Sequence, residues 1–204
     1  MDDATIALHD LSEQVAACPK CALSKTRTKA VPGAGDPHAD IVFIGEGPGY
    51  NEDQQGLPFV GQAGKFLDEL LASIDLRRED VYIANVIKCR PTNNRDPQPG
   101  EIEACAPWLD QQLDIIKPRM IVTLGRFSMS RYFQGQTIGR IHGQPKKIDG
   151  VVVVPMYHPA AALHQANLRG TIMEDFKKLP GILRELSQSA EEPAKPEPVQ
   201  MKLL

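Results

Sequence analysis

The feature that most constrains this chain is a set of four short, uninterrupted apolar runs, at residues 41–44, 81–86, 120–124 and 151–155. Each run is rich in β-branched residues and too short for a core helix, which favours strands buried on both faces. Segments with helical periodicity flank them, at residues 5–17, 64–74, 100–116, 126–133 and 170–186. We therefore predict a three-layer α/β/α sandwich around a central four-stranded parallel sheet.

Length, composition and charge limit the class of protein. The 204 residues are 42% hydrophobic and 24% charged, which is ordinary for one soluble globular domain. The net charge of −3 divides into −4 for residues 1–17, −1 for residues 188–204 and +2 for the body, which permits DNA binding without arguing for it. No run is long enough to span a membrane and the start lacks a secretory pattern, so we expect a cytoplasmic, nucleoid-associated protein.

The end of the chain differs in composition from the rest. After Leu186 it is rich in Ser, Ala, Glu and Pro and has no large apolar residue until the last few positions. Such a segment buries too little surface to offset the entropy of ordering. We expect one domain over residues 1–187 and a disordered tail over residues 188–204.

Unusual polar residues follow the predicted strands at the points where each strand ends. Residues 45–49 (Gly-Glu-Gly-Pro-Gly) follow the first strand, Asn85 closes the second, Gly125 follows the third and His158 follows the fourth. The carboxyl ends of parallel strands share one edge of a sheet, where ligands bind. The loop at 45–49 lacks both phosphate-binding fingerprints, which counts against a nucleotide-binding protein.

Three positions, Phe59, Asn85 and His158, have both a functional and a structural interpretation. Phe59, in a Gly- and Pro-rich loop, suits stacking on a nucleobase or packing in the core. The amide of Asn85 matches the O4 and N3–H edge of uracil and not that of cytosine, although an Asn at this position also forms turns. His158, before Pro159, is either structural or a donor to a developing anion.

The chain has four cysteines, Cys18, Cys21, Cys89 and Cys105, the first two in a C-x-x-C pair. This number and pairing fit a tetrahedral zinc site or a cubane iron–sulfur cluster. Four unliganded thiols are the third possibility. The spacing alone does not separate zinc from iron–sulfur.

Taken together, four motifs resemble family 4 of the uracil-DNA glycosylase superfamily, whose members carry a [4Fe-4S] cluster. They are residues 45–49, residues 52–61 (Glu-Asp-x-x-Gly-x-Pro-Phe-Val-Gly), residues 85–91 (Asn-Val-Ile-Lys-Cys-Arg-Pro) and residues 156–159 (Met-Tyr-His-Pro). The match runs from about residue 18 to residue 186. The resemblance implies a base excision repair enzyme that hydrolyses the bond between uracil and deoxyribose in DNA and leaves an abasic site.

The resemblance also implies roles for individual residues. It implies that the four cysteines ligate the cluster, that Gly45, Glu46 and Gly47 border the uracil pocket, and that Phe59 stacks on the base. It further implies that Asn85 reads the polar edge of uracil, that Glu52 blocks the methyl group of thymine, and that His158 bonds the carbonyl oxygen that gains charge. We expect Glu46 and His158 to be catalytic, with Glu46 positioning the attacking water.

One departure bears on the reaction. A sister group traps uracil-DNA covalently through a histidine in the loop between the Asn and the last cysteine. The corresponding residues 92–98 contain no histidine here. We therefore expect turnover; the alternative is a non-catalytic or covalently trapping iron–sulfur protein that binds uracil-DNA.

Two further segments suggest contacts with DNA and with a partner. Leu163 is either the apolar tip of a wedge that enters the space left by a flipped base or part of an ordinary helix start. The terminal segment from Gln200 to Leu204 resembles the glutamine-led peptides that bind bacterial sliding clamps, or is a residue run without function. We expect the protein to be a monomer.

Overall fold

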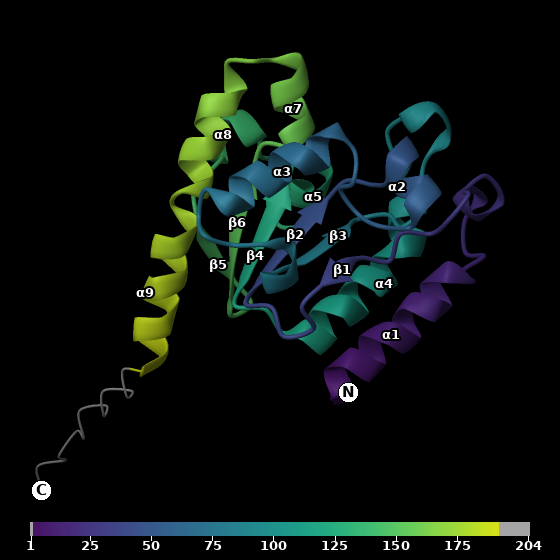
Figure 1. Cartoon of the computed structure of the whole chain (residues 1–204), viewed down its shortest axis with the longest axis horizontal. Helices are drawn as coiled ribbons and strands as arrows, with labels where there is room; N and C mark the ends of the chain where they lie inside the picture. Colours follow the sequence, from purple (N-terminus) through teal and green to yellow (C-terminus); the bar gives the residue numbers. More distant parts are fainter. Residues whose placement is uncertain (1, 192–204) are drawn as a thin grey trace, which may run out of the picture.

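The computed structural model describes residues 2–191 and places a six-stranded sheet between two layers of helices (Figure 1). The strand order is β1-β3-β2-β4-β6-β5. The strands are β1 (Ala34–Gly35), β2 (Ile41–Gly45), β3 (Tyr82–Asn85), β4 (Met120–Leu124), β5 (Lys146–Ile148) and β6 (Val151–Met156). The predicted α/β class and its three layers are confirmed.

The sheet is larger and more mixed than the predicted one. Strands β3, β2, β4 and β6 are mutually parallel and correspond to the four apolar runs. Strands β1 and β5 add an antiparallel edge on either side, so a sheet of four parallel strands describes only its centre. The edge strands have two and three residues that are partly or fully exposed, and therefore lack the apolar pattern that reveals a buried strand.

Alternate residues of the central strands face the two helical layers, as the period of a strand requires. Ile41 and Phe43 pack against the layer formed by α3, α8 and α9, where the ring of Phe43 stacks 5.7 Å from that of Phe176. Val42 and Ile44 pack against α1 and α4 on the opposite face. Both faces of the sheet are therefore buried, and only its edges are open to ligands.

Helices separate the four central strands along the chain. They are α1 (Asp3–Ala16), α2 (Tyr50–Gln55), α3 (Gln62–Ala72), α4 (Pro99–Ile116), α5 (Arg126–Ser130), α6 (Ile138–Ile141), α7 (Pro159–His164), α8 (Leu168–Phe176) and α9 (Leu179–Glu191), with 3₁₀ turns η1 (Ala22–Lys25), η2 (Arg78–Asp80) and η3 (Thr92–Asn94). Helix α4 shows how the sequence sets such bounds. It begins with Pro99 in its first turn, and ends where Lys117 turns left-handed ahead of Pro118.

The C-terminal region corrects two predictions. The helix expected over residues 170–186 is two helices, α8 and α9, because Pro180 has no N–H to continue the ladder through the joint. Helix α9 runs on to Glu191, past the predicted helix end at residue 186 and over the first residues of the predicted tail. Ser187, whose hydroxyl accepts a hydrogen bond from Arg119 at 2.9 Å, ties this last part of the helix to the start of β4.

Residue 1 and residues 192–204 lie outside the described residues, and so does the predicted clamp peptide from Gln200 to Leu204. None of the helices in the described part of the chain has the length and apolarity needed to cross a bilayer.

Candidate active site

A cavity of about 400 Å³ opens at the edge where β2, β3 and β6 end. Its walls come from segments far apart in the sequence: Glu46, Gly47, Pro48, Gly49, Glu52, Phe59, Ala63, Asn85, Ile87, Pro91, Asn94, Arg95, His158, Ala160 and His164. Six residues predicted for the substrate site are among them. The structure therefore brings these six residues together at the carboxyl edge of the sheet, where the edge rule for parallel sheets places ligands.

Gly45, predicted to border the pocket, is not among the residues that line this cavity but lies next to two that are, Asn85 and Phe59. It pairs with Asn85 across β2 and β3. A Cβ added at Gly45 would lie 2.4 Å from Oδ1 of Asn85 and 2.7 Å from Cζ of Phe59. Only glycine leaves room for the amide and the aromatic ring to meet at this point.

The amide of Asn85 is buried and its oxygen has no partner. The residue is 2% exposed, and Oδ1 is one of two buried side-chain atoms in the described residues without a hydrogen bond. A buried acceptor that stays unpaired is costly, and such atoms gather at binding sites. The oxygen is available to a donor that enters the cavity.

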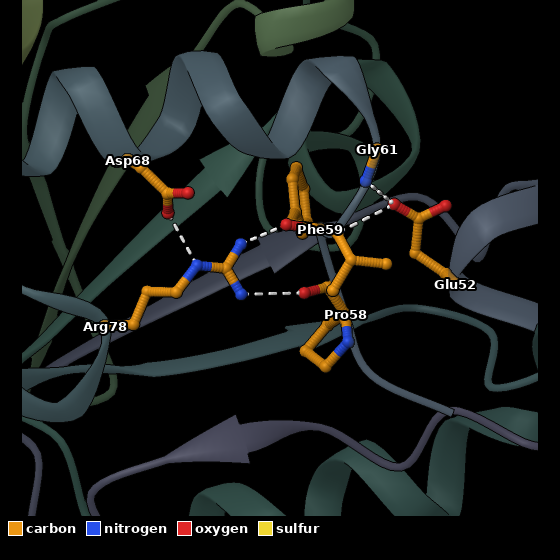
Figure 2. Close-up of polar contacts among 7 residues, drawn as sticks. Glu52, Pro58, Phe59, Gly61, Asp68 and Arg78 are labelled. Atoms are coloured by element: carbon orange, nitrogen blue, oxygen red, sulfur yellow. Dashed lines mark hydrogen bonds and ion pairs between the residues drawn. The ribbon is translucent and has the colours of Figure 1, made fainter. Parts of the chain in front are cut away.

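Phe59 forms part of the wall and has an uncommon backbone conformation. Its φ of 52° is in the left-handed region, and its ring stacks on the ring of His158 with centroids 5.4 Å apart. The following backbone is held by Glu52, whose Oε1 accepts N–H groups of Val60 at 2.9 Å and Gly61 at 2.8 Å (Figure 2). The wall is therefore fixed by the protein itself.

His158 is held as one neutral tautomer. Its Nδ1 accepts the backbone N–H of Ala160 at 3.1 Å, so the ring proton of the neutral form is on Nε2. Burial lowers the pKa of His158 to about 4, against a weak opposing effect of the Glu52 carboxylate. The ring is therefore a neutral hydrogen-bond donor at physiological pH.

Glu46 stands at the mouth of the cavity, next to charges on other loops. Burial and the Asp96 carboxylate raise the pKa of Glu46, while Arg126 lowers it. The loop that carries Asp96 is anchored by Arg95, which bonds Oε1 of Glu101 at 2.6 Å. The raised pKa makes the Glu46 carboxylate a better proton acceptor than an exposed one.

The four cysteines, of which Cys105 is part of α4, together line a second pocket. Three of the sulfurs accept N–H groups: Cys89 from Arg27 at 3.1 Å, Cys105 from the Lys88 backbone at 3.2 Å and Cys18 from Trp108 at 3.3 Å. Within residues 2–191, no three Cys, His, Asp or Glu side chains converge closely enough for a single metal ion. The N–H donors around these sulfurs suit thiolate ligands of a metal ion or of a cluster.

Lys88 lies between the cysteines and the cavity and is 1% exposed. Its Nζ donates to the backbone oxygen of Asn85 at 3.0 Å and to Oε1 of Gln112 at 2.6 Å, both neutral. Burial lowers the pKa of Lys88 to about 8, with Cys105 opposing the shift. A buried cation whose partners are neutral is costly unless negative charge is close, and thiolate ligands would supply it.

The family model described as "Uracil DNA glycosylase superfamily" matches residues 32–179, which include every residue that lines the cavity. Cys18 and Cys21 lie before the matched region. The chain belongs to this superfamily. The type-4 uracil-DNA glycosylase of Archaeoglobus fulgidus is 50% identical over 182 residues, covering 85% of this chain and 92% of that protein. The type-4 enzymes of Sulfurisphaera tokodaii and Saccharolobus solfataricus are 49% and 48% identical, covering 85% and 83% of this chain and 83% of each relative. These relatives place the chain in the type-4 group.

The sequence alone did not single out Lys88, which bonds the backbone of Asn85, or Asn94 and Arg95, which line the cavity. Lys88 comes two residues after the apolar run at 81–86, next to Ile87, where a charged side chain is unexpected, and that signal was available. Asn94 and Arg95 belong to the loop of residues 92–98, in which the sequence drew attention only to the lack of a histidine. Leu163 is 47% exposed on α7 and does not line the cavity, so its wedge role stays a prediction.

Proposed function

We propose that this chain hydrolyses the N-glycosidic bond of uracil in single- or double-stranded DNA, releasing uracil and leaving an abasic site. The observation that carries the proposal is the unpaired, buried Oδ1 of Asn85 in a cavity that also holds an aromatic wall and a neutral histidine donor. A target base must leave the duplex stack, and stacking and edge hydrogen bonds in a pocket compensate for that cost.

Recognition of uracil rests on its hydrogen-bonding edge. The N3–H of uracil donates to Oδ1 of Asn85, and the amide N–H₂ donates to O4. Cytosine presents an acceptor and a donor in the opposite order, so both contacts fail. Glu52, held by two backbone N–H groups, is the rigid part of the wall that excludes the methyl group of thymine.

The chemical step separates charge, and the site is arranged for that separation. The bond between N1 and C1′ breaks, and uracil leaves with the electron pair while the sugar becomes oxocarbenium-like. Nε2–H of His158 donates to the carbonyl oxygen that gains negative charge. Glu46 orients a water molecule and accepts its proton as the water oxygen bonds to C1′.

The cofactor we propose is a [4Fe-4S] cluster on Cys18, Cys21, Cys89 and Cys105, and when bound it would supply structure rather than a reacting atom. Membership of the type-4 group and the N–H donors to three sulfurs support it. Resemblance to the type-4 relatives is what favours a cluster over a single zinc ion on these four thiols. Iron and sulfide analysis should give about four of each per chain.

The test of the function is alkaline cleavage of labelled DNA that contains one uracil, next to matched strands with thymine or cytosine at that position. Cleavage at uracil alone is the expected result. Asn85→Leu, which keeps the size but removes the amide, should abolish cleavage, whereas Asn167→Leu, on the surface outside the cavity, serves as its matched control. If the wild-type protein binds the uracil strand without cleaving it, the proposal fails and a binding protein remains.

The same assay separates turnover from trapping. Residues 92–98 offer no histidine nucleophile, and Asn94 and Arg95 occupy the positions facing the cavity. We therefore propose multiple turnovers on excess substrate. A protein–DNA adduct that survives hot detergent would contradict this.

The remaining proposals concern where and with what the enzyme works. We propose a monomer that acts on chromosomal DNA in the cytoplasm, and that the segment from Gln200 to Leu204 binds a sliding clamp. Deleting these five residues should abolish clamp binding and leave cleavage of free DNA unchanged. Sedimentation of the full chain tests the monomer.

A further inference from the structure

The Phe59 wall depends on a residue that does not line the cavity. Phe59 is 5% exposed and has a left-handed φ of 52°, which a bulky side chain rarely adopts without support. The ring reaches the ring of His158 only because the backbone turns in this way. The support for this conformation therefore decides where the stacking surface lies.

Arg78, on η2, supplies that support from the far side of the loop. Its Nη1 donates to the carbonyl of Pro58 at 3.0 Å, and its Nη2 donates to the carbonyl of Phe59. Its Nε is anchored by the carboxylate of Asp68, on α3, at 2.5 Å. Figure 2 shows Arg78 and Glu52 on opposite sides of the segment that carries Phe59.

The other side of the Phe59 carbonyl is closed. A Cβ added at Gly64 would lie 1.8 Å from that oxygen, so the first turn of α3 packs directly against it. The carbonyl is thus held between a helix backbone and one guanidinium. A planar fork with fixed donors can hold two successive carbonyls and a carboxylate at once, which an ammonium on a flexible stem cannot do as rigidly.

We propose that Arg78 is a positioning residue for uracil excision: it fixes the Pro58 and Phe59 carbonyls, and thereby the aromatic surface on which the base stacks. The inference rests on the proposed function. Its effect reaches the substrate only through Phe59. If Arg78 had a purely structural role, replacing it would lower the stability of the protein without moving the ring of Phe59.

The test compares Arg78→Met with Arg77→Met. Arg77 is the neighbouring arginine, pairs with Glu79 and Asp80, and contacts neither carbonyl. Because misplacing a substrate contact by about 1 Å costs up to roughly 10²-fold, Arg78→Met should lower kcat/KM by about 10- to 100-fold, and Arg77→Met by about twofold at most. Equal effects of the two variants would overturn the proposal.

A double-mutant cycle decides whether Arg78 acts through the ring. In a Phe59→Ala background, Arg78→Met should have no further effect on kcat/KM, because the surface that it positions is gone. The same loss in both backgrounds would overturn the proposal. Arg78→Lys, which keeps the charge and one donor group, should recover part of the rate, and provides the comparison if Arg78→Met does not fold.

A readout without catalysis separates this proposal from the proposed function. In the wild-type protein, proton NMR should show contacts between the rings of Phe59 and His158, and Arg78→Met should weaken them while Arg77→Met should not. If the wild-type protein lacks glycosylase activity but these contacts respond as expected, only the proposed function fails. Unchanged ring contacts in Arg78→Met would overturn the positioning role in an active or inactive protein.

Discussion

The cavity and the cysteine pocket are neighbours joined by residues 85–89, yet they offer opposite chemistry to a ligand. The cavity presents an unpaired amide oxygen, an aromatic ring and a histidine kept neutral. Around the cysteine sulfurs are Arg27, the indole N–H of Trp108 and the buried ammonium of Lys88. One region suits a neutral, planar base that gains charge only during reaction, and the other suits a group that is negative from the start.

The two regions also differ in how complete they are. The cavity wall is held by hydrogen bonds within the protein, from Glu52 and from Arg78. In the cysteine pocket, burial raises the pKa of Cys105 to about 11 and that of Cys89 above its ordinary value, so these thiols are protonated unless a metal displaces the protons. The cavity is therefore pre-organised by the protein alone, whereas the cysteine pocket would gain its charge from the cluster proposed for it.

Removal of the metal should give the largest effect and should fall on one region only. Chelation is expected to release the segment that holds Cys18 and Cys21, so that η1 and the end of α1 lose protection from hydrogen exchange while β2, β3 and β4 keep it. Metal binding supplies folding free energy only to the segments that it joins. Exchange mass spectrometry measures this, and simultaneous loss of protection in the strands would show that the two regions unfold as one unit.

His158→Ala should give the largest effect that leaves the cysteine pocket untouched. Loss of a donor to the developing anion should reduce the single-turnover rate by roughly 10²–10³-fold. His164→Ala, at another position lining the same cavity, is the matched control and should retain most of the rate. Iron content should be the same in both variants, and a near-wild-type rate for His158→Ala would contradict the assigned role.

Lys88→Met tests the link between the regions and should affect both. It leaves the backbone oxygen of Asn85 and Oε1 of Gln112 without a donor, at a cost of about 1–3 kcal/mol for each buried group. We expect lower stability in urea and weaker discrimination of uracil from cytosine. Gln112→Leu removes one partner and leaves the bond to Asn85, so its discrimination should stay closer to wild type; equal losses would argue against a link through Lys88.

The pH dependence of stability should distinguish the cavity histidine from exposed ones. An unfolded histidine has a pKa near 6.5, whereas burial lowers the pKa of folded His158 to about 4. The contribution of neutral His158 is therefore complete above about pH 6.5 and is lost as the pH falls towards 4. Urea unfolding of wild type and His158→Gln across this range should show the stability difference shrinking with acidity; a constant difference would contradict the assigned pKa shift.

Leu163→Ala should give the smallest effect and the most selective one. If its exposed side chain enters the duplex, the variant should lose about tenfold or less on double-stranded substrate and nothing on single strands. Parallel assays on the two substrates measure the ratio. An unchanged ratio would assign Leu163 to an ordinary helix start.

The sequence was sufficient to predict the centre of the sheet and most of the cavity, because each depends on short patterns. Buried strands show as β-branched runs, and the edge rule then brings Glu46, Asn85 and His158 together. The edge strands β1 and β5 could not be predicted, because two or three half-exposed residues have no pattern of their own.

The contacts of Arg78 could not be predicted from the sequence for a different reason. Arg78 binds two carbonyl groups, which every residue carries, so no side-chain pattern marks its partners. The last helix was predicted to end at Leu186, short of Glu191, because the apolar stripe that identifies α9 stops before the helix does. Apolar periodicity reports what a helix buries and not how far its backbone continues.

The close approach at Gly45 has a consequence for how this enzyme can change over evolution. With Oδ1 of Asn85 only 2.4 Å from where a Cβ would stand, every substitution at Gly45 collides with the reading amide. Single substitutions at Gly45 are therefore closed as a route to a different pocket shape. Substitutions at Arg78 and Lys88, which bond the Phe59 and Asn85 backbones from outside the cavity, offer a route that does not fill it.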